Sequence, residues 1–349
     1  MTAVAMAEMR ERLRSAAVSA CAPGRLCLAG ESLDWMTGGP SVVAAVPLHT
    51  EVSVTRGDGG PVVLHSPDTE PATRVVHLPE LGAYAGDGLD YMQATAKVVT
   101  GSWPLLMGGA TIEARSSVPV GAGLSSSAAL TVATAAALMR FAVGVIPPAP
   151  SVAWAAYHAE AGELGTGAGW MDFLACTHGG VCRIDAGEQP RVTRLSGSLG
   201  APLVLIDTIQ RRTTRAVLAS KRDRYRSGDP AMRAYAEAAT GIVGEMTAEL
   251  RSAAPDAARV GGLLNQGQAL LRELVHCSTD LIDECVTRCL AAGAYGAKLT
   301  GSGHGGCLFA LAPLDAIGPV LAMLRDLPVR VMVFTTSEAH GVVFPPSEF

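Results

Sequence analysis

The chain has 349 residues, of which 49% are hydrophobic and 17% are charged, and its formal net charge is -5. This length and composition predict a globular protein of roughly two domains with a large apolar core. The mild negative charge provides no basic stripe for nucleic acid and no polybasic patch for a membrane surface, so the expected partner is a small molecule.

The first half of the chain alternates strand-like and helix-like segments. Runs of β-branched residues bounded by Gly, Pro and Asp predict strands at residues 26–29, 41–46, 51–55, 62–65 and 110–114. Segments rich in Ala, Leu and Met predict helices at residues 91–100, 126–143 and 151–164. Further strands are expected at residues 181–184 and 203–207.

The second half is dominated by long helical patterns, at residues 213–227, 230–253, 256–276 and 279–292. Strands at 306–312 and 329–335 enclose a helix at 314–324, and an apolar piece follows at 341–344. This change of pattern predicts an α+β protein with two lobes, one formed by residues 1–200 and the other by residues 201–349.

The N-terminal segment mixes acidic and basic residues and lacks the uninterrupted apolar core of a signal peptide, and no segment is expected to span a membrane. The 8 cysteines form no Cys-x-x-Cys pair and are expected to be reduced and mostly buried. Cys285 and Cys289 lack a matching pair of metal ligands nearby, so no zinc site is expected. The lack of a signal peptide and of a membrane span predicts a cytoplasmic protein. A monomer or a homodimer is expected.

A stretch rich in glycine and serine, PVGAGLSSSAAL at residues 119–130, leads into the helix expected at 126–143. The start of a helix offers unpaired N–H groups and a partial positive charge, and glycines let a phosphate approach the backbone closely. The alternative is a plain capping turn, because serine is a favoured N-cap residue and glycine is common in turns. The Walker A motif is absent, because no lysine follows these glycines. A cap needs one serine, however, and this run of serines predicts contacts to a polyphosphate or its metal ion.

Motifs in four places together resemble those of the GHMP kinase superfamily, which includes galactokinases, homoserine kinases, mevalonate kinases and phosphomevalonate kinases. PVGAGLSSSAAL resembles the phosphate-binding motif, and APGRLCLAGESLDWMTGG, at residues 22–39, resembles the first motif in its galactokinase version. KLTGSGHGGC, at 298–307, is similar to the third motif, and GWMDFLA, at 169–175, to the segment with the catalytic aspartate of galactokinases. The resemblance implies a two-lobed GHMP kinase fold with the active site in the cleft between the lobes.

The resemblance also implies a small-molecule kinase that uses ATP and Mg²⁺. Phosphoryl transfer needs a base for the proton of the attacking hydroxyl and a cation beside it, and we expect Asp172 and Arg25 in these roles. Without the resemblance, a helix cap and a surface salt bridge are the alternatives. The expected metal ligands are Ser127 and Glu160, with Glu163 as a competing carboxylate. The residues expected to bind ATP are Pro119, Gly121, Ala122, Gly123, Leu124, Ser125, Ser126, Ser127 and Ala128.

The acceptor is expected to contact Glu31, Ser32, Asp34, Tyr91 and Gly303. Ionised carboxylates accept hydrogen bonds from the neighbouring hydroxyls of a polyol, which suits a sugar. The corresponding stretch of galactokinases is similar to GEHTDYNGG, and this chain has GESLDWMTGG there. Ser32 thus stands in the place of a histidine, which removes an imidazole and leaves space in the pocket. The sequence predicts a sugar other than galactose, such as a heptose, an octose or a sugar phosphorylated at its far end. The predicted product is a sugar 1-phosphate, formed at the anomeric hydroxyl.

Other interpretations stay open: galactokinase itself, another GHMP kinase that acts on mevalonate or homoserine, or a sugar sensor without catalysis. Mevalonate is an anion, so Glu31 and Asp34 would repel it. The presence of Asp172 and Arg25 beside an unbroken serine stretch favours an enzyme over a sensor. The candidate contacts for a far-end phosphate are Arg211, Arg212 and Arg215.

Overall fold

The computed structural model describes residues 17–57, 59–102, 109–195, 197–211, 214–336 and 340–345. Its larger sheet contains β1 (Val18–Ala29), β2 (Pro40–Arg56), β3 (Val62–His65), β4 (Thr73–Val76), β5 (Ala110–Ser116), β6 (Val181–Asp185) and β7 (Arg191–Arg194). Its smaller sheet contains β8 (Leu203–Asp207), β9 (Gly296–Leu299), β10 (Cys307–Leu311) and β11 (Arg330–Phe334).

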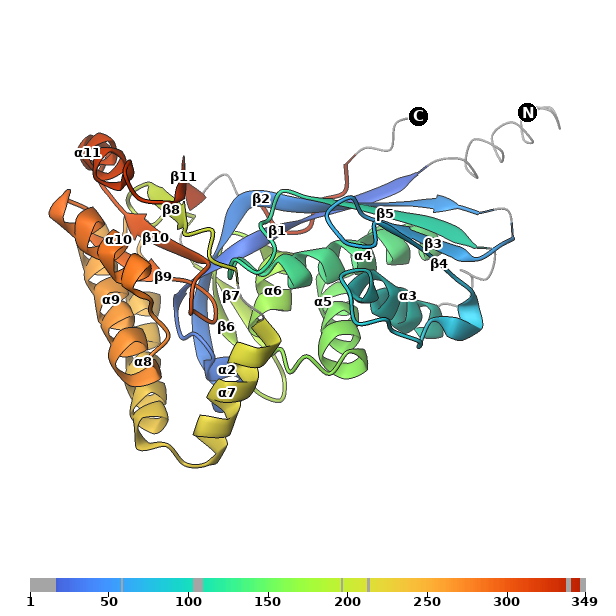
Figure 1. Ribbon diagram of the computed structural model, residues 1–349, viewed down its shortest axis with the longest axis horizontal. Helices are drawn as coiled ribbons and strands as arrows, with labels where there is room; N and C mark the ends of the chain where they lie inside the picture. The colour runs from blue at the N-terminus through green and yellow to red at the C-terminus, as the bar shows by residue number, and fades with distance from the viewer. Residues whose placement is uncertain are drawn as a thin grey trace.

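The helices are α2 (Leu33–Met36), α3 (Asp90–Ser102), α4 (Ser126–Val143), α5 (Ala149–Tyr157), α6 (Met171–His178), α7 (Thr214–Arg226), α8 (Pro230–Glu249), α9 (Ala257–Leu270), α10 (Asp280–Ala291) and α11 (Leu314–Leu324). A short 3-10 turn, η1 (Leu78–Glu80), and two π-helical turns, η3 (His158–Glu163) and η4 (Leu271–Val275), complete the described elements. Two sheets with helices packed against them confirm the predicted α+β class (Figure 1).

Strand β2 organises the larger sheet. It pairs with β1 along one edge, and its other edge pairs first with β6, at Pro40–Ala44, and then with β5, at Thr50–Arg56. The sequence predicted two strands here because Pro47 interrupts the pattern. Pro47 lies between the two stretches of pairing, where its missing N–H is not needed, so one long strand forms. Apart from β1, the strands of the larger sheet follow the order β4-β3-β5-β2-β6-β7.

Helix α4 forms the centre of the layer beneath the larger sheet, with α3, α5 and α6 beside it (Figure 1). Its bounds are those predicted. By length and composition it could cross a membrane, contrary to the expectation that no segment would. However, 61% of the helix is buried inside the protein, and Ala and Leu side chains on it pack against β1 and β2. Its apolar character therefore reflects its place in the core.

Short elements account for most differences from the sequence-based expectation: α2, α6, β4, β7 and β9 were not predicted. The helix predicted at residues 151–164 is also interrupted, because α5 ends at Tyr157 and continues as the wider turn η3. Wider turns of this kind are often found at functional sites. The apolar end of the chain returns to the larger sheet, where Val343 pairs with Cys21.

Candidate active site

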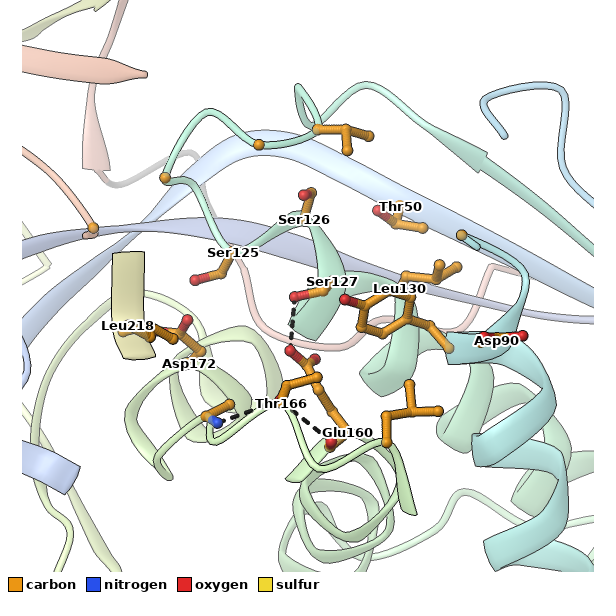
Figure 2. A pocket seen from close by; sticks show the side chains of 18 of the residues that line it. Thr50, Asp90, Ser125, Ser126, Ser127, Leu130, Glu160, Thr166, Asp172 and Leu218 are labelled. Atoms are coloured by element: carbon orange, nitrogen blue, oxygen red, sulfur yellow. Dashed lines mark hydrogen bonds between the residues drawn. The ribbon is translucent and has the colours of Figure 1, made fainter. Parts of the chain in front are cut away.

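A cavity of about 830 Å³ lies along the N-terminus of α4 (Figure 2). Its walls come from the larger sheet, from α2, α3, α4, η3 and α7, and from the glycine-rich loop after β9. This volume is in the range of small-molecule sites. The four motifs singled out in the sequence all contribute to its lining.

The loop before α4 is shaped as a phosphate site. Gly121 and Gly123 have positive φ angles of 69° and 82°, and Ser125 adopts the left-handed conformation with φ 61°. Although Ser125 is the N-cap residue, its side chain makes no capping hydrogen bond, and its buried Oγ has no partner. A plain capping turn would use this hydroxyl. An unpartnered hydroxyl in the cavity wall instead suits a ligand oxygen.

The predicted ATP-binding residues divide into two groups. Gly121, Gly123 and the three serines, Ser125 to Ser127, line the cavity. The other predicted residues do not line it: Pro119 is partly buried, and three side chains are buried in the core, namely Ala122, Leu124 and Ala128. Their side chains therefore shape the loop, and contact of their backbone N–H groups with a phosphate stays a prediction.

Arg25 and Asp172 meet at one end of the cavity. Nε of Arg25 donates to Oδ1 of Asp172 at 2.9 Å, and Nη2 of Arg25 lies 2.8 Å from the same oxygen. Nη1 of Arg25 donates at 2.6 Å to the carbonyl of Gly123 in the phosphate loop. Arg25 is 3% exposed and comes from β1, whereas Asp172 lies in the first turn of α6. The arginine thus joins the carboxylate to the loop before α4, and both side chains line the cavity.

Glu160 and Ser127 face each other beside this pair. Oγ of Ser127 donates to Oε1 of Glu160 at 3.1 Å, while Oε2 of Glu160 is buried and has no hydrogen-bond partner (Figure 2). Glu163 contacts Lys97 and the hydroxyl of Tyr84 instead. Since η3 directs Glu160 toward Ser127 and leaves Glu163 paired with a cation, Glu160 is the carboxylate that fits a metal ion here.

The third glycine motif closes against the phosphate loop. A Cβ atom on Gly301 would lie 2.8 Å from the backbone of Gly123, and one on Gly306 would lie 2.6 Å from the carbonyl oxygen of Ala122. Only glycine allows such an approach. Gly303, which was expected to contact the acceptor, packs against Cys277 and does not line the cavity. Its neighbours Gly301 and Ser302 line the cavity in its place.

Glu31 lines the cavity as expected, and it also has a partner that the sequence analysis did not foresee. Glu31 is 2% exposed, and its Oε1 forms an ion pair with Nζ of Lys298. Lys298 is fully buried and also donates to the carbonyl of Cys27 at 3.1 Å. A buried lysine is stabilised by a carboxylate partner, so Glu31 ties the segment after β1 to β9, and its contact with the acceptor stays a prediction. The clue in the sequence was a lysine, one of three in the chain, directly before the third motif.

Asp34 and Ser32 do line the cavity, next to Trp35. Oδ2 of Asp34 accepts a hydrogen bond from the backbone of Met171, next to Asp172, at 3.3 Å. Burial, followed by the nearby charge of Asp172, raises the pKa of Asp34 to about 6. Asp34 therefore provides a carboxyl group beside the expected base.

Tyr91 lies in the first turn of α3 and lines the cavity, as expected. Its contact with the acceptor stays a prediction.

The arginines expected to bind a far-end phosphate give little support to such a site. Arg211 pairs with Asp207 through both of its terminal nitrogens, at 2.6 and 2.7 Å. Arg212 and the side chain of Arg215 lie outside the described residues.

The protonation of Glu160 leads to a testable pH dependence. Burial, and then the charge of Asp172, raises the pKa of Glu160 from 4.5 to about 8. Between these values the folded chain holds a proton that the unfolded chain has released, so stability falls as pH rises. In metal-free protein we expect the melting temperature to decrease from about pH 5 to about pH 8, and Glu160→Gln to flatten this decrease. Calorimetry in EDTA measures it, and an equal decrease in the variant would contradict the assignment.

Comparisons with known proteins show the family of this chain. The family described as GHMP kinases N terminal domain matches residues 90–180, and the family described as GHMP kinases C terminal matches residues 246–328. A mevalonate kinase of Aeropyrum pernix is 32% identical over 299 residues, which cover 84% of this chain and 88% of that protein.

Solved structures of sugar-related kinases share the fold. Lactococcus lactis galactokinase complexed with galactose matches with a TM-score of 0.79 at 18% identity, over 97% of this chain and 99% of that one. A D-glycero-D-manno-heptose 1-phosphate kinase from Bacteroides thetaiotaomicron matches with a TM-score of 0.72 at 17% identity, over 94% and 99% of the two chains. These matches confirm the predicted two-lobed fold.

Proposed function

The chain belongs to the GHMP kinase family and is an ATP-dependent phosphotransferase with an alcohol group as acceptor, and we propose that Asp172 is its base and Arg25 its stabilising cation. The observation that carries this proposal is that the Arg25–Asp172 pair faces the same cavity as the phosphate loop. An acceptor hydroxyl placed between the Arg25–Asp172 pair and the phosphate loop would lose its proton to Asp172 while its oxygen attacks the terminal phosphorus of ATP. ADP leaves as the new P–O bond forms.

The residues present fit a bound Mg²⁺. The orphaned Oε2 of Glu160 and the hydroxyl of Ser127 are oxygen donors, the type that Mg²⁺ prefers. Within the described residues, no group of three or more His, Cys, Asp and Glu side chains could hold a metal ion alone. Mg²⁺ normally keeps several waters and shares substrate phosphates, so two protein ligands suffice. When bound, the ion would neutralise charge on the phosphates.

The two ends of the cavity suggest how the substrates lie. Asp172 and Leu218 are at one end of the serine stretch, while Thr50 and Asp90 are at the other (Figure 2). The terminal phosphate of ATP must face Asp172 for transfer to occur. The nucleoside would then extend toward Thr50 and Asp90, and the acceptor would lie between Asp172 and α2.

For the acceptor, the geometry best supports an uncharged polyol such as a sugar. In the described part of the chain, Asp34 forms no ion pair, and Arg25, already paired with Asp172, is the only cation that lines the cavity. Carboxyl groups bind hydroxyls well and repel an anionic acceptor. Phosphorylation at the anomeric hydroxyl, to give a sugar 1-phosphate, remains part of this proposal.

Mevalonate is the second candidate, and sequence similarity favours it. Mevalonate kinases of several Thermococcus and Pyrococcus species are 27% to 30% identical to this chain over at least 306 residues. The relatives thus support another GHMP kinase better than they support the sugar 1-kinase expected from the sequence. An acidic acceptor pocket is the observation that argues against mevalonate.

A panel of acceptors decides between the candidates. Aldoses of six to eight carbons, sugar phosphates, mevalonate and homoserine would each be incubated with ATP and Mg²⁺, and ADP would be measured. Phosphorus NMR of any product identifies the phosphorylated hydroxyl. Turnover of mevalonate or homoserine with no turnover of any aldose would overturn the polyol proposal.

Asp34→Asn provides a test within the protein itself. For a polyol acceptor, loss of the carboxylate weakens charge-assisted hydrogen bonds, and we expect the acceptor KM to rise by roughly tenfold. For mevalonate, loss of the negative charge should lower the KM. Steady-state kinetics at saturating ATP measures this change, and its sign identifies the acceptor class.

A further inference from the structure

The end of the cavity away from Asp172 is walled by a loop whose shape depends on one arginine. Tyr84, Gly86, Asp87 and Gly88 of this loop line the cavity, as does Asp90 at the start of α3. The loop connects η1 to α3 and has no strand or helix of its own between Leu81 and Asp90. Two backbone hydrogen bonds, from Ala83 to Glu80 and from Asp90 to Asp87, hold its ends, and side chains hold the part between them.

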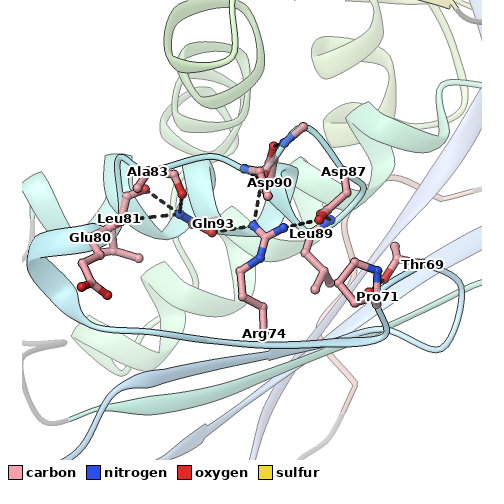
Figure 3. A network of polar contacts seen from close by, with 12 residues as sticks. Thr69, Pro71, Arg74, Glu80, Leu81, Ala83, Asp87, Leu89, Asp90 and Gln93 are labelled. Atoms are coloured by element: carbon pink, nitrogen blue, oxygen red, sulfur yellow. Dashed lines mark hydrogen bonds and ion pairs between the residues drawn. The ribbon is translucent and has the colours of Figure 1, made fainter.

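Arg74, on β4, reaches up to this loop from the sheet (Figure 3). Its Nη1 donates to Oδ1 of Asp90 and to Oε1 of Gln93, both at 2.7 Å, and its Nη2 pairs with Oδ2 of Asp87. The side chain of Arg74 is 15% exposed. One guanidinium thus holds three side chains at the start of α3.

Each of these side chains in turn holds the backbone of the loop (Figure 3). Asp90 accepts hydrogen bonds from the N–H groups of Ala85 and Gly86, at 3.0 and 2.6 Å. Gln93, which is fully buried, donates to the carbonyl of Ala83 at 2.9 Å. Oδ1 of Asp87, the oxygen that does not pair with Arg74, accepts a hydrogen bond from the N–H of Leu89 at 2.9 Å. Removing the arginine would release both carboxylates and the amide that set this wall.

Charge gives the same arginine a second effect. Asp87 and Asp90 both line a cavity that must admit a polyanionic nucleotide, and Arg74 pairs with both of them and offsets one of their two negative charges. Without it, two unpaired carboxylates would face the nucleotide. In Figure 2, Asp172 lies across Ser127 from Asp90, so we expect the acceptor end to keep its shape.

We propose that Arg74 is a positioning residue for nucleotide binding: it fixes the loop at residues 81–90 and offsets part of the negative charge of Asp87 and Asp90. This inference rests on the proposed function, because it takes the nucleoside to lie at this end of the cavity. Arg74 acts through other residues and has no part in the chemical step.

The test compares Arg74→Met with wild type and with Arg183→Met as a matched control. Arg183 also forms a two-point pair with an aspartate, Asp185, in the same sheet, but it does not line the cavity. For Arg74→Met we expect the Kd of Mg–ATP, from calorimetric titration, and the KM for ATP to rise roughly ten- to hundredfold. We expect kcat and the acceptor KM to stay within about twofold of wild type. The control should match wild type.

A second pair of variants separates charge from shape and covers the case in which Arg74→Met fails to fold. Arg74→Lys keeps the charge but not the fork of contacts, so its Kd should lie between those of wild type and Arg74→Met. Asp87→Asn added to Arg74→Met should recover part of the affinity because one unpaired charge is gone.

A fall in kcat with unchanged Kd for Mg–ATP would overturn the inference, as would equal losses in nucleotide and acceptor binding. Since the titration of Mg–ATP needs no acceptor, its Kd tests the role of Arg74 even if the acceptor proposed above is wrong. Wild-type protein that does not bind Mg–ATP would refute the proposed function and this inference together, whereas tight binding unaffected by Arg74→Met would refute only the inference.

Discussion

Replacing Asp172 by Asn should reduce kcat by roughly 10²- to 10⁴-fold, the usual contribution of a general base. The amide keeps the shape of the carboxylate, and its oxygen can still accept from Arg25. It cannot take a proton from the acceptor hydroxyl at neutral pH. Because the ligand contacts are otherwise kept, the KM values for ATP and acceptor should change little. A coupled assay of ADP formation at saturating substrates measures the effect.

Asp185→Asn is the matched control for this experiment. Asp185 also pairs with an arginine, at 2.7 Å, but it lies on β6 outside the cavity. The control should retain wild-type kcat. An Asp172→Asn enzyme with activity within about tenfold of wild type would remove Asp172 from the role of base.

Replacing Arg25 by Met should lower kcat by roughly 10²- to 10³-fold, the range found when a preorganised donor to a developing charge is lost. The substitution also leaves Asp172 without its cation and the carbonyl of Gly123 without its donor. Breaking a buried ion pair costs about 3 to 5 kcal/mol, and the 29% exposure of Asp172 places this pair at the lower end of that range. Both kcat and the melting temperature are therefore needed.

Arg25→Lys separates the two effects. Lysine restores the positive charge but not the simultaneous contacts to Asp172 and Gly123. We expect a stability near that of wild type and a kcat between those of wild type and Arg25→Met. If Arg25→Met loses stability but retains its kcat below the melting temperature, the arginine has only a structural role.

Much of this site could be predicted from local sequence. The phosphate loop combines glycines with a long apolar helix, and both features are determined by neighbouring residues. For that reason α4 has its predicted bounds, and the cavity opens at the predicted serines. Asp172 and Arg25, 147 positions apart, were brought together only by the family resemblance.

What the sequence could not indicate depends on partners distant in the chain. Glu31 carries a charge typical of a hydroxyl-binding residue, but Lys298, 267 positions away, pairs with it in the core. Gly303 lies in the expected loop, but it packs against Cys277. Its neighbours Gly301 and Ser302 face the cavity instead. Short strands such as β7 and β9 were missed because they are defined by their neighbours in the sheets rather than by their own residues.

The central claim is that the Arg25–Asp172 pair faces the terminal phosphate of a nucleotide held by the serines before α4. A crystal structure with Mg²⁺ and a non-hydrolysable ATP analogue tests this most directly. We predict phosphate oxygens against the backbone of the loop at residues 121–127, the metal ion between Ser127 and Glu160, and the terminal phosphate directed at Asp172. A nucleotide bound elsewhere, or with its terminal phosphate directed away from Asp172, would contradict the account.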